Sequence, residues 1–265
     1  MNRDLMHSAE IKELVRDAYR HVPPTTEAVA RALYSPEELS TVPACAAERS
    51  LGVANHLRYA DISPGDTVLD LGCGGGIDSV LAARRTGPVG RVFALDFLPE
   101  MLARTAHAAS EAGLTNIEPL EGELEAIPLP DASVDVVISN GVINLSPRKA
   151  RVLAECARVL RPDGVFCVAD LTVNRDDLPP EVLSSPAAWA GCVAGALAEA
   201  DLVHKLERVG FQDVDIPYRR PLSIDDCALY PLFGDDLIAL MRRLVPPDRQ
   251  DAVAVAAVFR ARNGS

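Results

Sequence analysis

Three glycines and a carboxylate alternate in one short turn of the sequence. Asp70, Gly72, Gly74 and Gly76 form the pattern Asp-x-Gly-x-Gly-x-Gly in the stretch VLDLGCGGGID, with Cys73 inside the turn. Glycines at such positions let the backbone bend sharply and let a ligand approach without a Cβ in the way. A helix N-terminus behind the turn favours a negatively charged group. The stretch therefore predicts a ligand-binding turn between a strand and a helix.

The spacing of the glycines favours one nucleoside ligand over another. A dinucleotide turn has the pattern Gly-x-Gly-x-x-Gly, and its third glycine would fall on Ile77. This mismatch favours S-adenosylmethionine, whose methionine moiety packs over a turn of this kind, and Asp70 is then expected to face the ammonium group. Asp96 ends the next predicted strand, where a carboxylate can accept both ribose hydroxyls. The alternative is that Asp96 only caps a helix whose start is indicated by Pro99.

Further residues suit a nucleoside. Glu123 and Leu124 follow the third predicted strand, where a carboxylate and a backbone amide can read the adenine edge. Phe97 can cover an adenine face, and the alternative is a core aromatic.

Short β-branched runs alternate with helical patterns in the part of the chain that carries these residues. The runs cover 67–72, 91–96, 134–140 and 165–170, with weaker or later candidates at 116–122, 213–218 and 252–262. This alternation predicts a parallel sheet with helices on both faces. Helices are also expected around 202–209 and 236–244, and one is expected to start at Pro147. Residues 1–60 show helical stretches, punctuated by prolines, but no strand.

The expected fold is therefore α/β, with a doubly wound Rossmann-like sheet that is mostly parallel and has an antiparallel last strand. Residues 1–60 are expected to form an N-terminal helical cap and residues 61–265 the Rossmann-like domain, the two making a single structural unit.

The net charge and the cysteine spacing limit the classes of partner and site that the chain is expected to have. Acidic residues outnumber basic ones 38 to 26, which gives a formal net charge of −12 and makes nucleic acid an unexpected partner. No apolar run is long enough to span a bilayer and the N-terminal pattern is not that of a signal peptide, so a cytoplasmic protein without a membrane partner is expected. The six cysteines contain no Cys-x-x-Cys pair, which argues against a metal site.

These residues resemble a class I S-adenosylmethionine-dependent methyltransferase. The stretches GGGIDSVLAARRTGPVGRV, GELEAIPLPDASVDVVISNGVINLSP and CVAGAL resemble the arsenite methyltransferase family more specifically, and the similarity runs from about residue 10 to the C-terminus. The resemblance implies S-adenosylmethionine as cofactor and a role for Tyr19 near it. The expected cofactor-binding residues are Tyr19, Asp70, Gly72, Cys73, Gly74, Gly76, Asp96, Phe97, Met101, Gly122, Glu123, Leu124 and Asn140.

The chain differs from the family that it resembles at the residues expected to bind the acceptor. That family binds trivalent arsenic through cysteine thiolates, but Val53 and Gly141 stand where two of these thiols are expected, and only Cys192 matches the third. A single thiolate holds thiophilic arsenite poorly. Cys45 can supply a second thiol only through a shifted loop.

A small organic acceptor therefore suits the chain best, with methylation of O, N or C left open. The expected acceptor site contains Val53, His56, Gly141, Asn144 and Cys192. Methyl transfer from a sulfonium needs a base only if the acceptor is protonated, and His56 is the candidate base. The alternative is that His56 is an exposed or helix-cap histidine.

Three alternatives stay open. The chain can be an arsenite methyltransferase that uses Cys45 and Cys192, a non-catalytic S-adenosylmethionine-binding protein, or an enzyme that carries out another reaction on S-adenosylmethionine. The sequence leaves the oligomeric state open.

Overall fold

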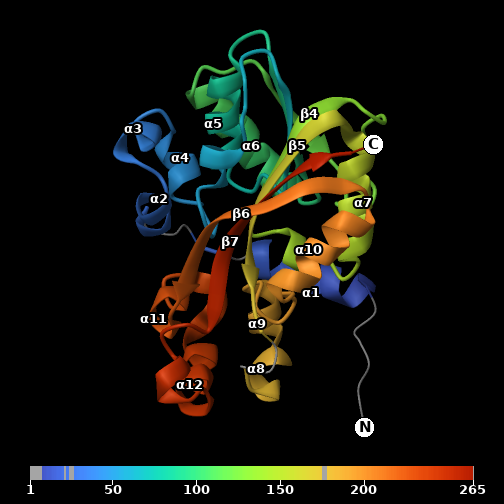
Figure 1. Cartoon of the computed structure of the whole chain (residues 1–265). Helices are drawn as coiled ribbons and strands as arrows, with labels where there is room; N and C mark the ends of the chain where they lie inside the picture. The colour runs from blue at the N-terminus through green and yellow to red at the C-terminus, as the bar shows by residue number, and fades with distance from the viewer. Residues whose placement is uncertain (1–7, 21, 24–26, 175–177, 265) are drawn as a thin grey trace.

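The computed structural model describes residues 8–20, 22–23, 27–174 and 178–264. A single seven-stranded sheet forms its centre (Figure 1). The strands are β1 (Thr67–Leu71), β2 (Arg91–Asp96), β3 (Ile117–Glu121), β4 (Val134–Asn140), β5 (Leu160–Thr172), β6 (Phe211–Leu222) and β7 (Ala254–Asn263).

The order of the strands across the sheet is β3-β2-β1-β4-β5-β7-β6. The pairs from β3 to β5 are parallel, and β7 runs antiparallel to both β5 and β6. The expected mostly parallel sheet with an antiparallel last strand is confirmed. Leu71 lies opposite both Leu95 and Ser139, so the carboxyl ends of β1, β2 and β4 lie side by side. After β1 the sheet continues through β2 and β3 on one side of β1, and the chain then crosses to β4 on the other side. In open α/β sheets ligands bind where the strand order reverses in this way, which is called the switch point.

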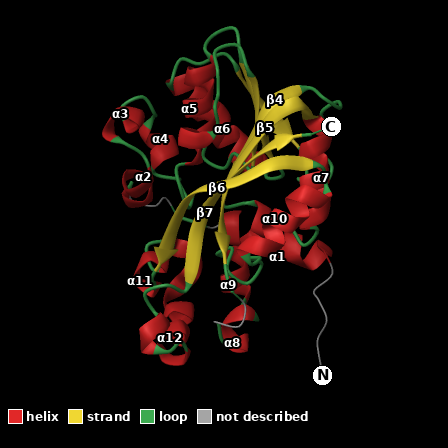
Figure 2. Ribbon diagram, in the orientation of Figure 1, coloured by secondary structure: helices red, strands yellow, loops and turns green. Residues whose placement is uncertain are grey.

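Helices cover both faces of the sheet (Figure 2). The longer ones are α1 (Ser8–Arg20), α5 (Ile77–Thr86), α6 (Pro99–Glu111), α7 (Lys149–Val159), α10 (Glu199–Arg208) and α12 (Gly234–Leu244). Shorter helices are α2 (Ala28–Leu33), α3 (Pro36–Leu39), α4 (Ala44–Ala47), α8 (Pro180–Leu183), α9 (Pro186–Ala190) and α11 (Ile224–Cys227). The 3-10 turns are η1 (His56–Tyr59), η2 (Ile143–Leu145), η4 (Pro231–Phe233) and η5 (Pro247–Arg249).

Alternate residues of each strand enter two hydrophobic clusters, one on each face of the sheet. Val68 belongs to one cluster and Leu69 to the other, because successive side chains of a strand point to opposite faces. The first cluster also contains Val29 and Leu57, so the N-terminal segment shares the core of the sheet. The second contains Leu153 of α7 and Leu206 of α10, among others.

The elements differ from expectation mainly at their ends. The segment after β4 forms the turn η2 before α7 begins at Lys149, two residues later than expected. Strand β6 extends beyond the predicted run because it pairs with β7 from Phe211 to Leu222. Strand β5 extends at both ends, where Leu160 pairs with Val134 of β4 and Thr172 with Val255 of β7. No helix in the described part of the chain is long and apolar enough to cross a membrane.

Candidate active site

Three cavities lie at the switch-point edge of the sheet. The space that they enclose, together with their openings to solvent, is about 740, 660 and 390 Å³. Gly72 and Gly74 line both the first and the second cavity, Gly141 lines the second and the third, and Tyr19 lines all three. The cavities are therefore parts of one continuous site.

The glycine turn connects β1 to α5 and leaves open space at its centre. Gly74 has φ +53°, and a Cβ placed on it would meet no atom nearer than 3.9 Å. Its amide donates a hydrogen bond to the Asp96 carboxylate over 3.2 Å. A ligand can therefore lie directly against the backbone between these two residues.

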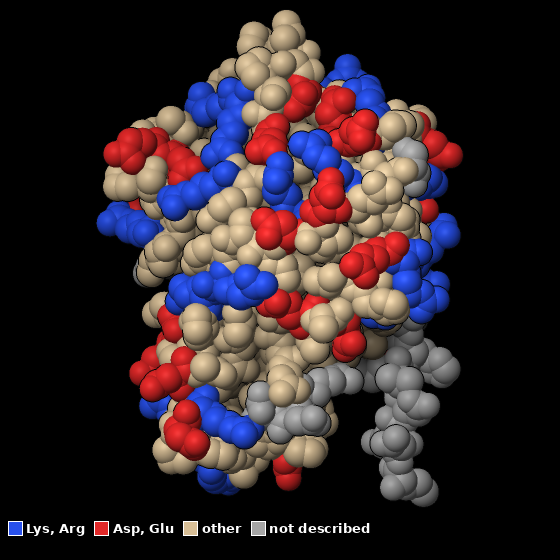
Figure 3. Space-filling model, viewed as in Figure 1, with Lys and Arg blue, Asp and Glu red and all other residues tan. Residues whose placement is uncertain are grey.

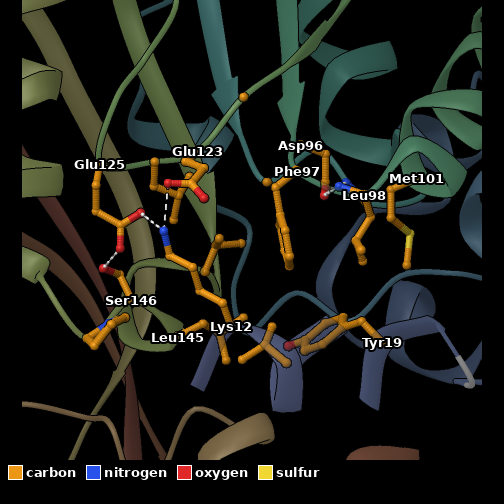
Figure 4. Close-up of a pocket in the computed structure, with 17 residues that line it drawn as sticks. Lys12, Tyr19, Asp96, Phe97, Leu98, Met101, Glu123, Glu125, Leu145 and Ser146 are labelled. Atoms are coloured by element: carbon orange, nitrogen blue, oxygen red, sulfur yellow. Dashed lines mark hydrogen bonds and ion pairs between the residues drawn. The ribbon is translucent and has the colours of Figure 1, made fainter. Parts of the chain in front are cut away.

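Asp96 ends β2 at the rim of the first cavity (Figure 4). Its carboxylate accepts hydrogen bonds from the amides of Gly74 and, over 3.0 Å, Leu98. Burial raises the pKa of Asp96, and the bonds from Leu98 and Gly74 oppose this. Leu98 is the N-cap of α6 and Pro99 its first residue, so Asp96 holds the start of the helix and also faces the cavity. The two roles considered for it are compatible, since a carboxylate has further lone pairs to offer a ligand.

The first cavity is otherwise mostly apolar. The predicted cofactor residues that line it are Tyr19, Gly72, Gly74, Asp96, Phe97, Met101, Gly122, Glu123 and Leu124. Arg16 of α1 lies over the Phe97 ring, 5.7 Å from its centroid.

Helix α1 closes the first cavity with Lys12, a residue that no motif in the sequence pointed to. Lys12 lies 2.6 Å from a carboxylate oxygen of Glu123 and 3.4 Å from one of Glu125 (Figure 4). Glu125 is buried and also accepts a hydrogen bond from Ser146 over 2.7 Å. Glu123 was expected to read the adenine edge, and its carboxylate pairs with Lys12 in this structure.

The second cavity carries charges of both signs. Asp70 is buried and accepts a hydrogen bond of 2.5 Å from Ser79, and its burial followed by the charge of Asp78 raises its pKa to about 8. Arg49 and Arg104 line the same cavity. Burial and then the Arg49 charge lower the pKa of Arg104. A cavity with carboxylates and guanidinium groups suits a zwitterion, such as the amino acid end of a ligand.

Asn140 also lines the second cavity, but protein groups hold its side chain. Its oxygen accepts from the Val53 amide over 2.8 Å, and its nitrogen donates to Asp78 over 3.1 Å and to the Ala54 carbonyl over 2.9 Å. A Cβ on Gly52 would lie 2.4 Å from the Asn140 side chain. Asn140 therefore fixes the segment that precedes η1 against the end of β4.

Two further residues that were predicted to bind the cofactor, Cys73 and Gly76, belong to the glycine turn itself. Cys73 lines the second cavity and accepts a hydrogen bond from Thr105 over 3.3 Å. Gly76 is the N-cap of α5, with φ +89°, and packs on Thr105. Gly76 is not among the described residues that line the three cavities.

The third cavity brings Val53, Gly141 and Cys192 together, as expected for an acceptor site. A Cβ on Gly141 would lie 3.5 Å from a Val53 methyl group, and the Cys192 thiol donates to the Gly141 carbonyl over 3.0 Å. Cys227 and Tyr230 line the same cavity, although no local pattern in the sequence connects them with it. None of the described residues that line this cavity is charged.

His56 and Asn144 lie outside all three cavities among the residues described. His56 is fully buried, its two ring nitrogens meet no hydrogen-bond partner of good geometry among the described residues, and burial lowers its pKa. Asn144 donates from its side chain to Asp170 over 2.8 Å and to the Leu171 carbonyl over 2.6 Å. His56 is thus enclosed in the core, and Asn144 anchors the loop after β4 to the end of β5. Their placement does not support the expected contacts with an acceptor.

Cys45 also lies outside the three cavities. Its thiol donates to Glu111 over 3.1 Å at the surface of α6, and burial, with that contact, raises its pKa to about 11. The structure therefore does not bring Cys45 and Cys192 to one cavity.

Comparisons with known proteins agree with this arrangement. The family described as "Methyltransferase domain" matches residues 62–210. The arsenite methyltransferase of Halobacterium salinarum is 40% identical over 69% of this chain and 46% of its own length. Nocamycin O-methyltransferase from Saccharothrix syringae is 30% identical over 76% of this chain and 80% of its own length.

A solved structure extends the likeness over almost the whole chain. The arsenic (III) S-adenosylmethionine methyltransferase from Chlamydomonas reinhardtii is 31% identical, with a TM-score of 0.63, over 95% of this chain and 73% of that one. The chain spans about half the length of the arsenite methyltransferases from Halobacterium salinarum and Aquipseudomonas alcaligenes, at 46% and 51%. The chain belongs to the arsenite methyltransferase-like family of S-adenosylmethionine-dependent methyltransferases.

Proposed function

We propose that the protein transfers the methyl group of S-adenosylmethionine to a small organic acceptor bound in the third cavity. The observation that carries this proposal is the junction of the second and third cavities at Tyr19, Leu51 and Gly141. A cofactor in the first two cavities and an acceptor in the third would meet there. The residues around the junction are mostly apolar, and an in-line displacement needs alignment and the exclusion of water.

The residues of the first two cavities fit S-adenosylmethionine. In this proposal Asp96 accepts the ribose hydroxyls, Asp70 faces the ammonium group, and Arg49 with Arg104 takes the carboxylate. The open space at Gly74 admits the chain that joins these parts. The cofactor supplies an electrophilic methyl group, and the protein aligns the acceptor with it.

Burial keeps the thiols and the phenol of Cys192, Cys227 and Tyr230, among the described residues of the third cavity, protonated near neutral pH, so they are poor general bases. Burial raises the pKa of the Cys192 thiol well above its ordinary value and those of Cys227 and Tyr230 to about 12. We therefore propose an acceptor whose nucleophilic atom already has a free lone pair at neutral pH, such as a neutral amine or a phenolate. Whether oxygen, nitrogen or carbon is methylated follows from that acceptor.

Release of S-adenosylhomocysteine tests the proposal directly. Full-length protein is incubated with S-adenosylmethionine and a panel of phenols, amines and carbon acids, with arsenite plus excess thiol as a separate arm. We expect turnover with one organic class and none with arsenite. Binding of S-adenosylmethionine without turnover across the whole panel would favour the alternative of a non-catalytic protein, and product formation without any acceptor would favour another reaction on the cofactor.

Arsenite methylation is the second candidate, and the placement of Cys227 is what favours it. Cys192 and Cys227 line the same cavity, whereas Cys45 does not. This candidate predicts arsenite-dependent turnover that is lost in both Cys192→Ser and Cys227→Ser but kept in Cys45→Ser. Turnover that depends on Cys45 would instead restore the pairing of Cys45 with Cys192.

We also propose the cytoplasm as its location, with no nucleic acid or membrane partner. The formal net charge of −12 disfavours contact with phosphate backbones and anionic lipids. On the face drawn in Figure 3, Lys and Arg side chains are interspersed with Asp and Glu. In the same proposal, residues 1–60 act as a cap that belongs to the same structural unit as residues 61–265.

A further inference from the structure

Three side chains with metal-binding atoms meet between α4 and α6, away from the three cavities. Cys45 lies on α4, and His107 and Glu111 lie on α6, which packs against α4 (Figure 1). Cys45 is half-buried, and the side chains of His107 and Glu111 are 64% and 47% exposed, so solvent can deliver an ion to them.

The spacing of the cluster is close to that of a metal site. The Cys45 sulfur lies 3.1 Å from one Glu111 oxygen, and the His107 Nε2 lies 3.5 Å from the other. One ligand atom from each of the three residues lies within 4.8 Å of the others. In a tetrahedral zinc site the ligand atoms are roughly 3.2–3.8 Å apart, given metal–ligand distances of about 2.0–2.3 Å. The two printed contacts are close to this range, and the side chains would have to draw the remaining ligand atoms together, from within 4.8 Å, to surround one ion.

We propose that Cys45, His107 and Glu111 bind a divalent zinc-class cation, with water completing the coordination. A thiolate, an imidazole and a carboxylate form a ligand set of borderline softness, which zinc accepts and which magnesium, with its preference for oxygen ligands, does not. The thiol proton that now points at Glu111 passes to solvent when the ion binds. His107 and Glu111 are four residues apart on α6, so both face α4.

The ion would join the N-terminal segment to the Rossmann-like unit. The chain leaves α4 toward Arg49, which lines the second cavity, and α6 carries Met101 and Arg104, which line it from the other side. A cation between α4 and α6 therefore stabilises the position of Arg49 relative to Arg104. Binding is expected to raise the melting temperature of the folded protein, because the unfolded chain does not hold the three ligands together.

The test uses full-length protein without a histidine tag, kept reduced by a phosphine instead of a thiol. Zinc affinity is measured by competition with a chelating dye, and cobalt(II) is used as a spectroscopic probe. We expect one zinc ion per chain and a cobalt spectrum with a thiolate charge-transfer band. Cys45→Ser is expected to remove that band. Cys45→Ser, His107→Gln and Glu111→Gln are each expected to weaken zinc binding at least about 10-fold.

The matched control is His204→Asn, which removes an exposed histidine from α10. It is expected to bind zinc as the unchanged protein does, and magnesium is expected to leave the melting temperature unchanged. The proposal is overturned if zinc affinity is the same in Cys45→Ser as in the unchanged protein, or if cobalt binds without the thiolate band. Circular dichroism of each variant separates loss of the site from loss of the fold.

Discussion

Asp70 and Asp96 lie near the ends of adjacent strands, but their surroundings differ and suit them to different ligand groups. Asp70 accepts from one hydroxyl and stands beside Asp78, whereas Asp96 accepts from two backbone amides. Burial raises the pKa of both carboxyl groups, but the amides oppose this effect at Asp96. Asp96 is therefore suited to neutral hydroxyl groups and Asp70 to a cation that compensates its charge.

Removal of the Asp96 carboxylate is expected to weaken cofactor binding. Asp96→Ala should raise the Kd for S-adenosylhomocysteine roughly 10- to 100-fold, because hydrogen bonds to a charged group contribute about 1.5–3 kcal/mol. Isothermal titration calorimetry measures the change. Asp235→Asn on the exposed first turn of α12 is the control. If Asp96→Ala folds and binds with unchanged affinity, Asp96 does not contact the ribose.

Asp70 predicts a pH dependence of cofactor affinity. Its pKa is raised to about 8 in the folded protein, so between about pH 4 and pH 8 the folded state binds more protons than the unfolded state. The contribution of Asp70 to folding stability is therefore complete at low pH and is lost as the pH rises through 8. An ammonium group prefers the ionised carboxylate, so the affinity for S-adenosylhomocysteine should increase from pH 6 to pH 8, by at most about 10-fold per unit.

Asp70→Asn isolates this effect. The variant is expected to bind the ligand more weakly at pH 8 and to lose most of the pH dependence. Without ligand at pH 8 it should unfold at the same or a higher temperature, since it removes a buried carboxyl group that is partly ionised at that pH. Titrations at pH 6, 7 and 8 and thermal unfolding measure both properties. An unchanged pH dependence in Asp70→Asn would assign the titration to another group.

At the scale of elements, α1 is held over the first cavity by charged contacts. Lys12 reaches Glu123 and Glu125, and Arg20 lies 3.1 Å from Glu100. The contact with Glu125 matters most, because the Glu125 side chain is only 5% exposed and the Glu123 side chain is 53% exposed. Exposed ion pairs contribute little, whereas a buried carboxylate that loses its partner is costly.

Lys12→Gln is therefore expected to loosen α1. We predict a rise of roughly fivefold in the Kd for S-adenosylhomocysteine, corresponding to about 1 kcal/mol, mainly through faster dissociation. Stopped-flow measurements at low and high salt test this, and the difference from the unchanged protein should shrink at high salt. Arg31→Gln, which removes the exposed pair with Glu27 on α2, is the matched control and should leave the rates unchanged.

At the scale of the whole molecule, the sheet and its two hydrophobic clusters carry the stability that the site requires. Phe166 of β5 is fully buried and packs on Phe211 of β6, with ring centroids 4.8 Å apart. Phe166→Ala is expected to lower the free energy of unfolding by about 3–5 kcal/mol, because it leaves a cavity in this cluster. Val89→Ala, at a side chain that is 83% exposed, should change it by less than about 0.5 kcal/mol. Urea unfolding curves compare the two, and equal effects would contradict this account of the core.

The sequence by itself determined the strands, their order of appearance and the glycine turn. These features are local, because the period of apolar residues and the backbone freedom of glycine depend only on residues close together along the chain. Asp96 and Asn140, two of the residues expected around the cofactor, end β2 and β4 for the same reason. Gly141, Val53 and Cys192 were also expected at one site, and they line one cavity.

Only the tertiary structure decided which distant residues meet. Lys12 lies against Glu123, Cys227 shares a cavity with Cys192, and Cys45 lies beside Glu111 instead of at that cavity. His56 has a sequence position close to Val53, yet it points into the core. The direction in which a side chain leaves an irregular segment depends on the packing of that segment against the sheet, and no periodicity in the sequence records it. The lack of a Cys-x-x-Cys pair argued against a metal site, whereas a ligand set assembled from α4 and α6 has no spacing that can be recognised along the chain.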